Sequence, residues 1–202
     1  MSGVADGHER VDPRVQRTRR LLQDALLTLA RERSLDEISV ADIADHATIN
    51  RTTFYQHYPD TDTLLADALD AQAALVGADL STIRPDAGPD ETPEVLVRWA
   101  SLVADHHVLY RRALGEHGSP VAVARLRRRI ELLAIEGLAR HDAPEVVSPP
   151  PEILAAALAG SLIGVIGAWL ERDPLPPPSD AAAWAWAAVN GFPQEARRRS
   201  RG

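Results

Sequence analysis

The sequence of 202 residues contains no cysteine and no lysine. Without cysteine there are no disulfide bonds, thiolate metal sites or cysteine nucleophiles, which excludes a secreted disulfide scaffold. The first residues have no basic segment followed by an apolar stretch, so no signal peptide is visible and we expect a cytoplasmic protein. An apolar content of 45% is ordinary for a packed globular protein, which excludes a disordered or collagen-like chain.

Sequence motifs for catalysis and for metal binding are also missing. The seven histidines show no HExxH-type or other metal-ligand spacing, and the neighbours His106 and His107 point about 100° apart on a helix. The sequence has no GxSxG nucleophile motif and no phosphate-binding glycine loop. We therefore expect neither an enzyme nor a protein that binds a metal or another cofactor.

The charges are distributed unevenly along the chain. All 22 basic residues are arginine, and with 29 acidic residues the net charge is -7, which argues against nonspecific coating of nucleic acid. Residues 10–58 contain eight arginines and seven acidic residues, whereas residues 59–202 contain 14 and 20. Arg14, Arg17, Arg19 and Arg20 fall within seven positions that contain no acidic residue. We therefore expect any anion-binding surface in the first quarter of the chain.

Apolar residues recur at helical spacing along most of the chain, and no stretch has the alternation of a strand, so we predict an all-α fold. Ser39 with Asp42 forms a partial capping box, and Asn50 and Asp60 are suited to cap the next two helices. The clearest break is the Pro-, Gly- and acid-rich segment 84–93, near which we place a subdomain boundary. The predicted helices cover 13–33, 40–46, 51–57, 60–83, 94–114, 119–141, 152–172 and 179–191.

Residues 39–58 show a helix-turn-helix pattern, with two short helices around a four-residue turn. On the second of these helices, Ile49, Phe54 and Tyr58 have the spacing of a buried face. The remaining side chains then face solvent or a ligand, and their donors, acceptors and methyl groups suit DNA bases and phosphates. This outward set consists of Arg51, Thr52, Thr53, Tyr55, Gln56 and His57. The plainer interpretation of this helix alone is an exposed polar surface.

Three segments, residues 18–27, 38–47 and 51–58, together resemble the N-terminal DNA-binding domain of TetR-family transcriptional regulators. The resemblance covers about 50 residues and a further Leu64-Leu65 pair. It implies an all-helical homodimer with a three-helix DNA-binding head. It also implies a larger C-terminal domain that binds a small effector and dimerises through its last two helices. We accordingly divide the chain into a flexible arm at 1–12, a DNA-binding domain at 13–58, an effector-binding and dimerisation domain at 59–192 with a connecting helix at 59–83, and a flexible tail at 193–202.

The resemblance also implies roles for single residues. Ser39 and Asn50 correspond to capping positions near phosphates, Arg51 and Thr53 to base or phosphate contacts, and Tyr55 and His57 to phosphate contacts. The predicted DNA-binding set is Arg14, Arg17, Ser39, Asn50, Arg51, Thr52, Thr53, Tyr55, Gln56 and His57. Two positions depart from the family pattern. Thr48 stands where the turn commonly has glycine, so the turn has either a strained left-handed backbone there or a different shape. Thr61, between Asp60 and Asp62, stands where the fourth helix frequently has lysine.

In the C-terminal half, two sets of residues are candidates for further sites. Trp99, Val103, His106 and Tyr110 share one helical face and could line an effector pocket, although plain core packing is the competing interpretation. Residues 153–170 contain no charged residue, a length that approaches a membrane span. We favour instead a helix buried by its neighbours and by a second subunit. Gly160, Gly164, Trp169 and Trp184 are the candidate interface residues, and for Trp169 a core role is the alternative.

We therefore predict a homodimeric regulator, a repressor that a small-molecule effector releases from a palindromic double-stranded DNA operator. The alternative from another class is a small-molecule-binding or protein-interaction dimer on a TetR-like scaffold that binds DNA weakly or not at all. The acidic residues Asp60 and Asp62 motivate this alternative, because they add negative charge where a phosphate contact is expected.

Overall fold

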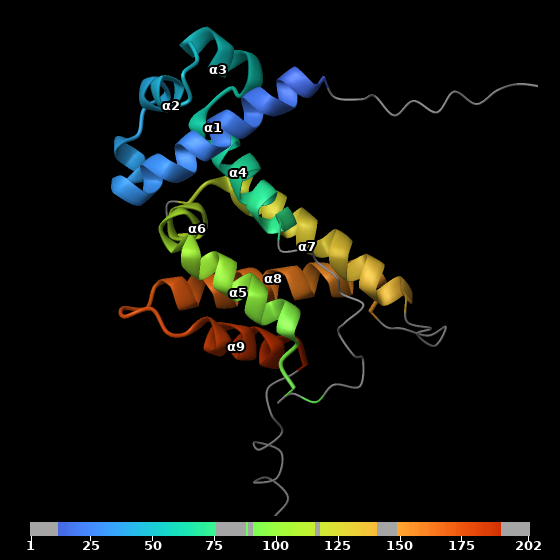
Figure 1. Ribbon diagram of the computed structural model, residues 1–202. Helices are drawn as coiled ribbons and strands as arrows, with labels where there is room; N and C mark the ends of the chain where they lie inside the picture. The colour runs from blue at the N-terminus through green and yellow to red at the C-terminus, as the bar shows by residue number, and fades with distance from the viewer. Residues whose placement is uncertain (1–11, 76–87, 89–90, 116–117, 141–148, 191–202) are drawn as a thin grey trace, which may run out of the picture. The chain divides into compact units, whose positions relative to one another are not determined.

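The computed structural model describes residues 12–75, 88, 91–115, 118–140 and 149–190 (Figure 1). It confirms the predicted all-α fold, because these residues form helices and no strand. The helices are α1 (Pro13–Glu32), η1 (Leu35–Glu37, a 3-10 turn), α2 (Val40–His46), α3 (Arg51–His57), α4 (Thr61–Leu75), α5 (Glu94–Asp105), α6 (His107–Leu114), α7 (Pro120–Arg140), α8 (Pro151–Leu170) and α9 (Pro178–Asn190). The chain divides into two compact units between Leu64 and Leu65, here called the head and the C-terminal unit.

Helix α1 begins at Pro13, where a fixed φ and a missing N–H suit the first helical position. The carboxylate of Asp12 accepts a hydrogen bond of 2.8 Å from the backbone N–H of Arg14 and caps the helix. Asp12, predicted as the last residue of a flexible arm, is therefore part of the helix start. The rest of the predicted arm and the predicted tail at 193–202 lie outside the described residues.

The head is built from α1, α2 and α3, which pack against one another around an apolar core. Leu22 and Leu26 of α1, Ile43 of α2, and Phe54 and Tyr58 of the α3 region are almost completely buried. Burying each such side chain contributes about 1.5 to 3 kcal/mol, so the three short segments depend on this core rather than on helix propensity alone. The inward spacing predicted for Phe54 and Tyr58 is confirmed, whereas Ile49 is only half-buried.

Helix α4 begins at Thr61, and the carboxylate of Asp60 caps it by accepting a hydrogen bond of 2.7 Å from the backbone N–H of Thr63. The predicted capping role of Asp60 is confirmed. The described part of α4 ends at Leu75, so the predicted continuation to Ile83 lies outside the described residues. The division between the two units falls within α4, which therefore contributes residues to both. Of the predicted break at 84–93, residues 84–87 and 89–90 also lie outside the described residues.

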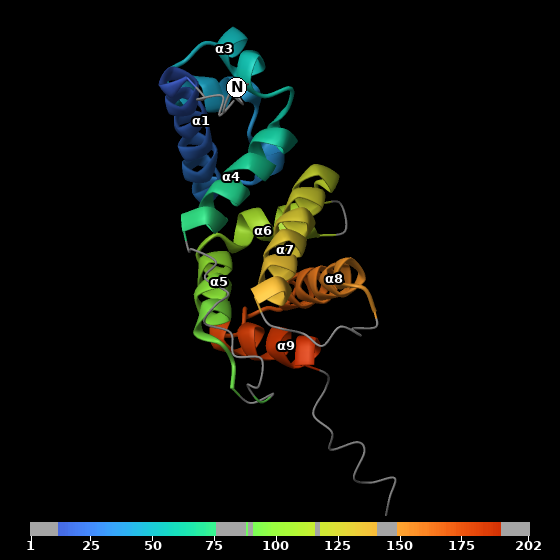
Figure 2. The same cartoon turned by 90° about the vertical axis from the view of Figure 1, so that its right-hand side faces the viewer.

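In the C-terminal unit, helix α8 packs against α7, α9 and α6, and α5 packs against α9 and α6 (Figures 1 and 2). The core includes Val103, Tyr110, Ala155 and Trp169, each at most 1% exposed. An 18-residue window of α8 has a mean hydropathy of 2.2, and the helix is long and apolar enough to cross a membrane by length and composition. It packs against three other helices, and 28% of its apolar window is buried among the described residues.

The prediction of a single helix over 94–114 is wrong, because His106 separates α5 from α6. His106 has φ -121° and ψ 28°, outside the helical region. The ring Nδ1 of His107 lies 3.1 Å from the carbonyl oxygen of Ala104, which a continuous helix would bond to a backbone N–H of the next turn. Side chains that compete for backbone groups in this way interrupt helices.

Candidate nucleic-acid interface and ligand cavity

Helix α3, which contains the predicted outward set of side chains, is held by its cap and by the apolar side chains beneath it. The Asn50 Oδ1 accepts hydrogen bonds from the Thr53 backbone N–H at 2.7 Å and from the Thr53 hydroxyl at 2.9 Å. Phe54 is completely buried, and its ring meets the Tyr55 ring edge to face at a centroid distance of 5.4 Å. The helix is therefore anchored at its start and along its inner side.

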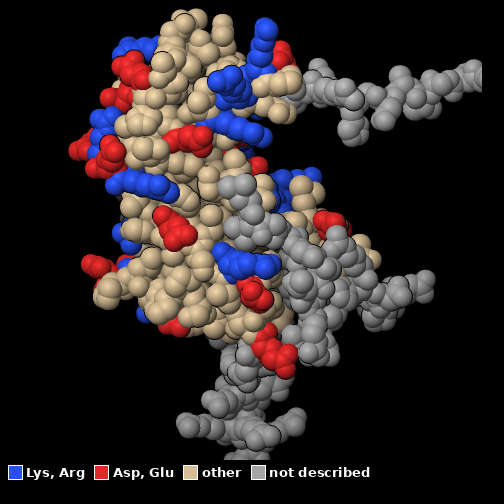
Figure 3. All heavy atoms as spheres, in the orientation of Figure 1, with Lys and Arg blue, Asp and Glu red and all other residues tan. Residues whose placement is uncertain are grey.

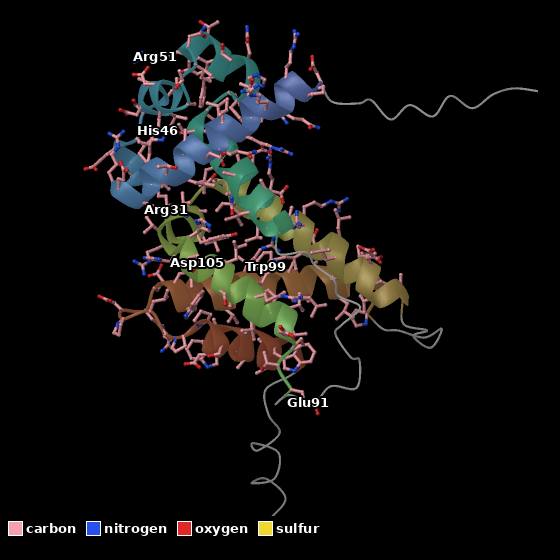
Figure 4. The ribbon with its side chains drawn as sticks, viewed as in Figure 1. Arg31, His46, Arg51, Glu91, Trp99 and Asp105 are labelled. Carbon is pink, nitrogen blue, oxygen red and sulfur yellow. The ribbon has the colours of Figure 1, made fainter. Side chains whose placement is uncertain are left out.

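The opposite face of α3 is polar and open. Arg51, Thr52 and Gln56 are exposed, and Tyr55 is 59% exposed, an unusually high value for so large a ring. Thr53 and His57 are half-buried at the edges of this face. Figure 4 labels Arg51 at the surface of the head, at the start of α3. Of the six residues of α3 that were predicted to face outward, four are thus exposed and two are half-buried.

Helix α2 is fixed by a complete capping box. The Ser39 hydroxyl donates to Asp42 Oδ2 at 2.6 Å and accepts from the Asp42 backbone N–H at 3.2 Å, while the Ser39 backbone N–H donates to the same carboxylate oxygen at 2.9 Å. The Arg33 guanidinium lies 3.1 Å from the other oxygen. The hydrogen bonds from Ser39, helped by Arg33, lower the pKa of Asp42 to about 2. The predicted partial capping box is confirmed.

The turn between α2 and α3 has the hydrogen bonds of a Schellman motif. The Ile49 N–H donates to the Ala44 carbonyl at 2.9 Å and the Thr48 N–H to the Asp45 carbonyl at 3.1 Å. Thr48, which donates the second of these bonds, has φ 57°, in the left-handed region that usually requires glycine. A left-handed backbone at this non-glycine residue costs about 1 to 2 kcal/mol. Thr48 therefore adopts the left-handed conformation that glycine usually supplies at such a position.

The arginines of α1 contribute positive charge to the surface of the head. Arg14, Arg17, Arg19 and Arg20 are exposed, and Figure 3 shows arginine side chains projecting near the start of α1. The Arg19 guanidinium lies over the Tyr58 ring, 5.6 Å from its centroid, and the Gln23 side chain donates to the Tyr58 hydroxyl at 3.4 Å. Tyr58 directly follows α3, so these contacts join α1 to the end of that helix.

Asp60, one of the two acidic residues that stand beside Thr61, has a structural role. Its carboxylate is engaged by the backbone N–H and side chain of Thr63, and these hydrogen bonds lower its pKa. A capping carboxylate also interacts favourably with the helix dipole at an N-terminus. The ionised carboxylate of Asp60 therefore stabilises the N-terminus of α4.

A separate site is a cavity of about 330 Å³ inside the C-terminal unit. Three of the four predicted pocket residues, Trp99, Val103 and Tyr110, line it, and Figure 4 labels Trp99 on α5. His106 is not on its wall, because the backbone leaves the helix there. Most of the wall comes from α7, α8 and α9, including Leu126, Ile130, Leu158, Leu162, Ile166 and Trp186. Sequence analysis missed these residues because an apolar core face and a pocket wall share one pattern.

The candidate interface residues on α8 and α9 differ in exposure. Gly164 is exposed and Gly160 half-exposed, and a Cβ atom added to either would meet no atom within 4 Å. Trp184 is 38% exposed and stacks with the Arg172 guanidinium at 4.9 Å from its ring centroid. Trp169 is completely buried, and its ring N–H donates to the Pro176 carbonyl at 3.0 Å. Of the two roles considered for Trp169, the structure thus supports the core role.

Comparison of the sequence with known proteins finds similarity mainly in the head. The sequence model described as "Bacterial regulatory proteins, tetR family" matches residues 22–68, which include α2, α3 and the start of α4. The uncharacterized HTH-type transcriptional regulator YxbF of Bacillus subtilis (strain 168) is 36% identical over 73 residues, or 36% of this chain. That match spans only 19% of the length of the curated relative.

Solved structures extend the likeness to the fold of most of the chain. A TetR transcriptional regulator from Rhodococcus sp. RHA1 is 18% identical, with a TM-score of 0.62 over 87% of this chain and 95% of that one. Thermus thermophilus FadR, a TetR-family transcriptional repressor in complex with lauroyl-CoA, is 20% identical, with a TM-score of 0.60 over 87% of this chain and 95% of its own. At these identities the likeness concerns the fold alone.

Proposed function

We propose that this chain is a TetR-family transcriptional regulator that represses transcription by binding a palindromic DNA operator as a homodimer and is released by a small-molecule effector. The observation that supports this most is the two-sided character of α3. Its inner side is fixed by Phe54 and by the Asn50 cap, and its outer side presents Arg51, Thr52, Tyr55 and Gln56 to solvent.

In the proposed complex, α3 of each subunit enters a major groove. The Arg51 guanidinium donates to guanine acceptors, the Gln56 amide pairs with adenine, and the Thr52 methyl contacts a thymine methyl. Tyr55, His57, Thr53 and the capping residues Ser39 and Asn50 lie next to phosphates, and Arg14 and Arg17 neutralise further phosphates. The two-fold symmetry of a dimer requires half-sites about one helical turn apart, roughly 34 to 36 Å.

We propose that two subunits associate through α8 and α9. Gly160 and Gly164 leave a smooth, open strip on α8, and Trp184 offers an exposed aromatic ring on α9. Small residues permit close approach of helices, and aromatic residues are enriched at interfaces. This association would cover the face of α8 that its own chain leaves open. It would also suit a water-soluble protein that acts in the cytoplasm.

The cavity of the C-terminal unit is the proposed effector site. Its volume of about 330 Å³ lies at the lower end of the range of about 300 to 1,000 Å³ for ligand pockets. The proposed role is binding, without catalysis. Effector binding would favour dimers whose heads no longer match the operator spacing. To change the ratio of operator-binding to released dimers from 99:1 to 1:99, the effector must bind the released state more tightly than the operator-binding state by about 5.5 kcal/mol.

A second candidate function is a ligand-binding or protein-interaction dimer that does not read DNA. The acidic residues Asp60 and Asp62 beside Thr61 favour it, since they place negative charge at the start of α4. Asp60 caps α4 through its carboxylate, so its presence is explained without a loss of DNA binding. This favours the DNA-binding proposal.

Selection of bound sequences from a pool of random duplexes with the purified full chain tests the proposal. We expect enrichment of one palindrome, followed by a shifted band of the dimer on that duplex in a mobility-shift assay. Enrichment of no sequence, with a folded dimer confirmed in the same preparation, would favour the second function.

A further inference from the structure

We infer that Gly137 of α7 sets the length of ligand that the cavity of the C-terminal unit accepts, because its missing side chain keeps the cavity open along the C-terminal half of α7. The inference rests on the proposed function, since the cavity is the proposed effector site. It adds a residue that distinguishes long ligands from short ones.

Helix α7 forms one long wall of the cavity. Its contribution consists of Leu126, Ile130, Leu133, Ala134, Gly137 and Leu138. From Leu126 to Gly137 this wall extends about 16 Å along the helix, at a rise of about 1.5 Å per residue. A ligand that starts beside Leu126 and lies along α7 therefore reaches Gly137 only if it is long.

Gly137 lies in the middle of the helix face that borders the cavity. It follows Leu133 by four residues and Ile130 by seven, and positions at these intervals share one face of a helix. A side chain at position 137 would therefore project into the cavity. Among the described residues of the wall, Gly137 is the one that has no side chain. The large side chains of Leu126 and Ile130 are thus followed by open space at this end of α7.

The usual structural use of glycine does not explain this position. Glycine in a helix is less favourable than alanine, because it loses more backbone freedom on folding. Glycine often ends a helix, but α7 continues through position 137 to Arg140. The glycines of α8 differ, because a Cβ atom added at Gly160, Gly164 or Gly167 meets no atom within 4 Å and none of the three lines the cavity. Space inside the cavity is the feature that Gly137 provides.

Isothermal titration of the full-length chain and of Gly137→Leu with 1-hexanol and 1-decanol, without DNA, tests the inference. The added leucine side chain fills one end of the cavity. We therefore expect 1-decanol to bind at least about 10-fold more weakly, the contribution of about two excluded methylene groups. The affinity for 1-hexanol should change by less than about 2-fold, because the shorter chain fits beside Leu126 and Ile130. An equal loss for both alcohols, an unchanged affinity for 1-decanol, or no binding of 1-decanol to the native chain would overturn the inference.

The matched control is Gly167→Leu, the same change in α8 at a position outside the cavity wall. It should leave the affinities for both alcohols unchanged. A selective loss of 1-decanol binding in this control as well would show that the effect does not depend on position 137, and would contradict the inference.

Gly137→Ala keeps the test valid if Gly137→Leu does not fold. Alanine is the better helix former, so we expect the melting temperature to rise by about 1 to 4 °C. The added methyl group should lower the affinity for 1-decanol by about 4-fold and leave that for 1-hexanol unchanged. In that case, an unchanged affinity for 1-decanol in Gly137→Ala would refute the role of Gly137.

None of these titrations involves an operator. A wrong assignment of Gly137 would therefore leave operator selection intact, and failure of operator selection would leave the difference between the two alcohols unchanged.

Discussion

Single side chains at the helix starts determine how α2 and α3 are held in the head. Ser39 and Asp42 satisfy each other's backbone N–H groups, and Asn50 binds both the backbone and the hydroxyl of Thr53. These bonds occupy donors at the beginning of each helix that would otherwise lack partners. Both helices have seven residues, a length at which isolated helices are marginal in water. The caps are therefore essential to the candidate interface.

The Ser39 hydroxyl is the largest cause of the lowered Asp42 pKa, which leads to a testable expectation. Ser39→Ala should raise the pKa of Asp42 from about 2 towards its ordinary value of 3.8. Because the pKa is lower in the folded chain, ionised Asp42 stabilises the fold above about pH 4, and this stabilisation is lost as the pH falls towards 2. Carboxyl NMR titration of both chains measures the shift.

Asp42→Asn is the control for that titration, because it removes the carboxyl group and with it this part of the acid dependence of stability. An unchanged Asp42 titration in Ser39→Ala would contradict the assigned cause of the low pKa. It would leave the backbone N–H of residue 39 and the Arg33 guanidinium, 3.1 Å from the carboxylate, as the causes of the low pKa.

Residue-level prediction from sequence succeeded where the chemistry is local. The caps at Ser39, Asn50 and Asp60 follow from side chains that accept from a backbone N–H three residues further along, a relation that is visible in the sequence. The family turn left two possibilities open at Thr48, a strained left-handed backbone or a different turn. The structure has the strained backbone, because the two flanking hydrogen bonds of the Schellman motif require it.

Among the helices, boundaries with a capping side chain were predicted well, whereas the boundary between α5 and α6 was not. The bounds of α1, α2 and α3 agree with the predicted ones to within one residue. The break between α5 and α6 at His106 was missed, because apolar spacing continues through it and the interruption depends on backbone geometry and on the ring of His107. The predicted four-residue pocket face lost His106 for the same reason.

Helix α8 combines a buried side with an open strip, which suggests a direct test of the proposed dimer. Gly164→Arg should leave helicity unchanged, because Gly164 is exposed and a Cβ atom added there meets no atom within 4 Å. It should dissociate the dimer by placing a charge in a desolvated interface, a change expected to cost several kcal/mol. Sedimentation velocity in the micromolar range measures the oligomeric state.

The matched control for that experiment is Ala124→Arg, which adds the same side chain at an exposed position of α7 and should preserve the dimer. A dimer that survives Gly164→Arg at all concentrations would contradict association through this face of α8.

For the chain as a whole, sequence defined the head in more detail than the C-terminal unit. The head combines local caps, a short turn and a distinctive outward set of side chains on α3. The cavity depends on how α5, α7, α8 and α9 pack at long range, and no periodicity distinguishes its wall from an ordinary core. Its volume and most of its lining residues emerged only from the structure.

The distribution of charge along the chain agrees with a division of roles. The net charge of -7 belongs mainly to residues 59–202, whereas the arginine cluster on α1 lies in the unit that contains α3. A dimer that neutralises phosphates with two or three arginines per subunit would have a log–log salt slope of roughly -4 to -6. Specificity would then come from α3 and a uniform contribution to affinity from α1.

The most direct test of DNA reading by α3 compares Arg51→Ala and Arg17→Ala on the selected operator and on a random duplex of equal length. Arg127→Ala, an exposed arginine of α7, serves as the control and should change neither affinity. We expect Arg51→Ala to lose about 1 to 3 kcal/mol more on the operator than on random DNA. Arg17→Ala should weaken both duplexes alike and reduce the magnitude of the salt slope of the dimer by about 2. Equal losses on both duplexes for Arg51→Ala would contradict the account.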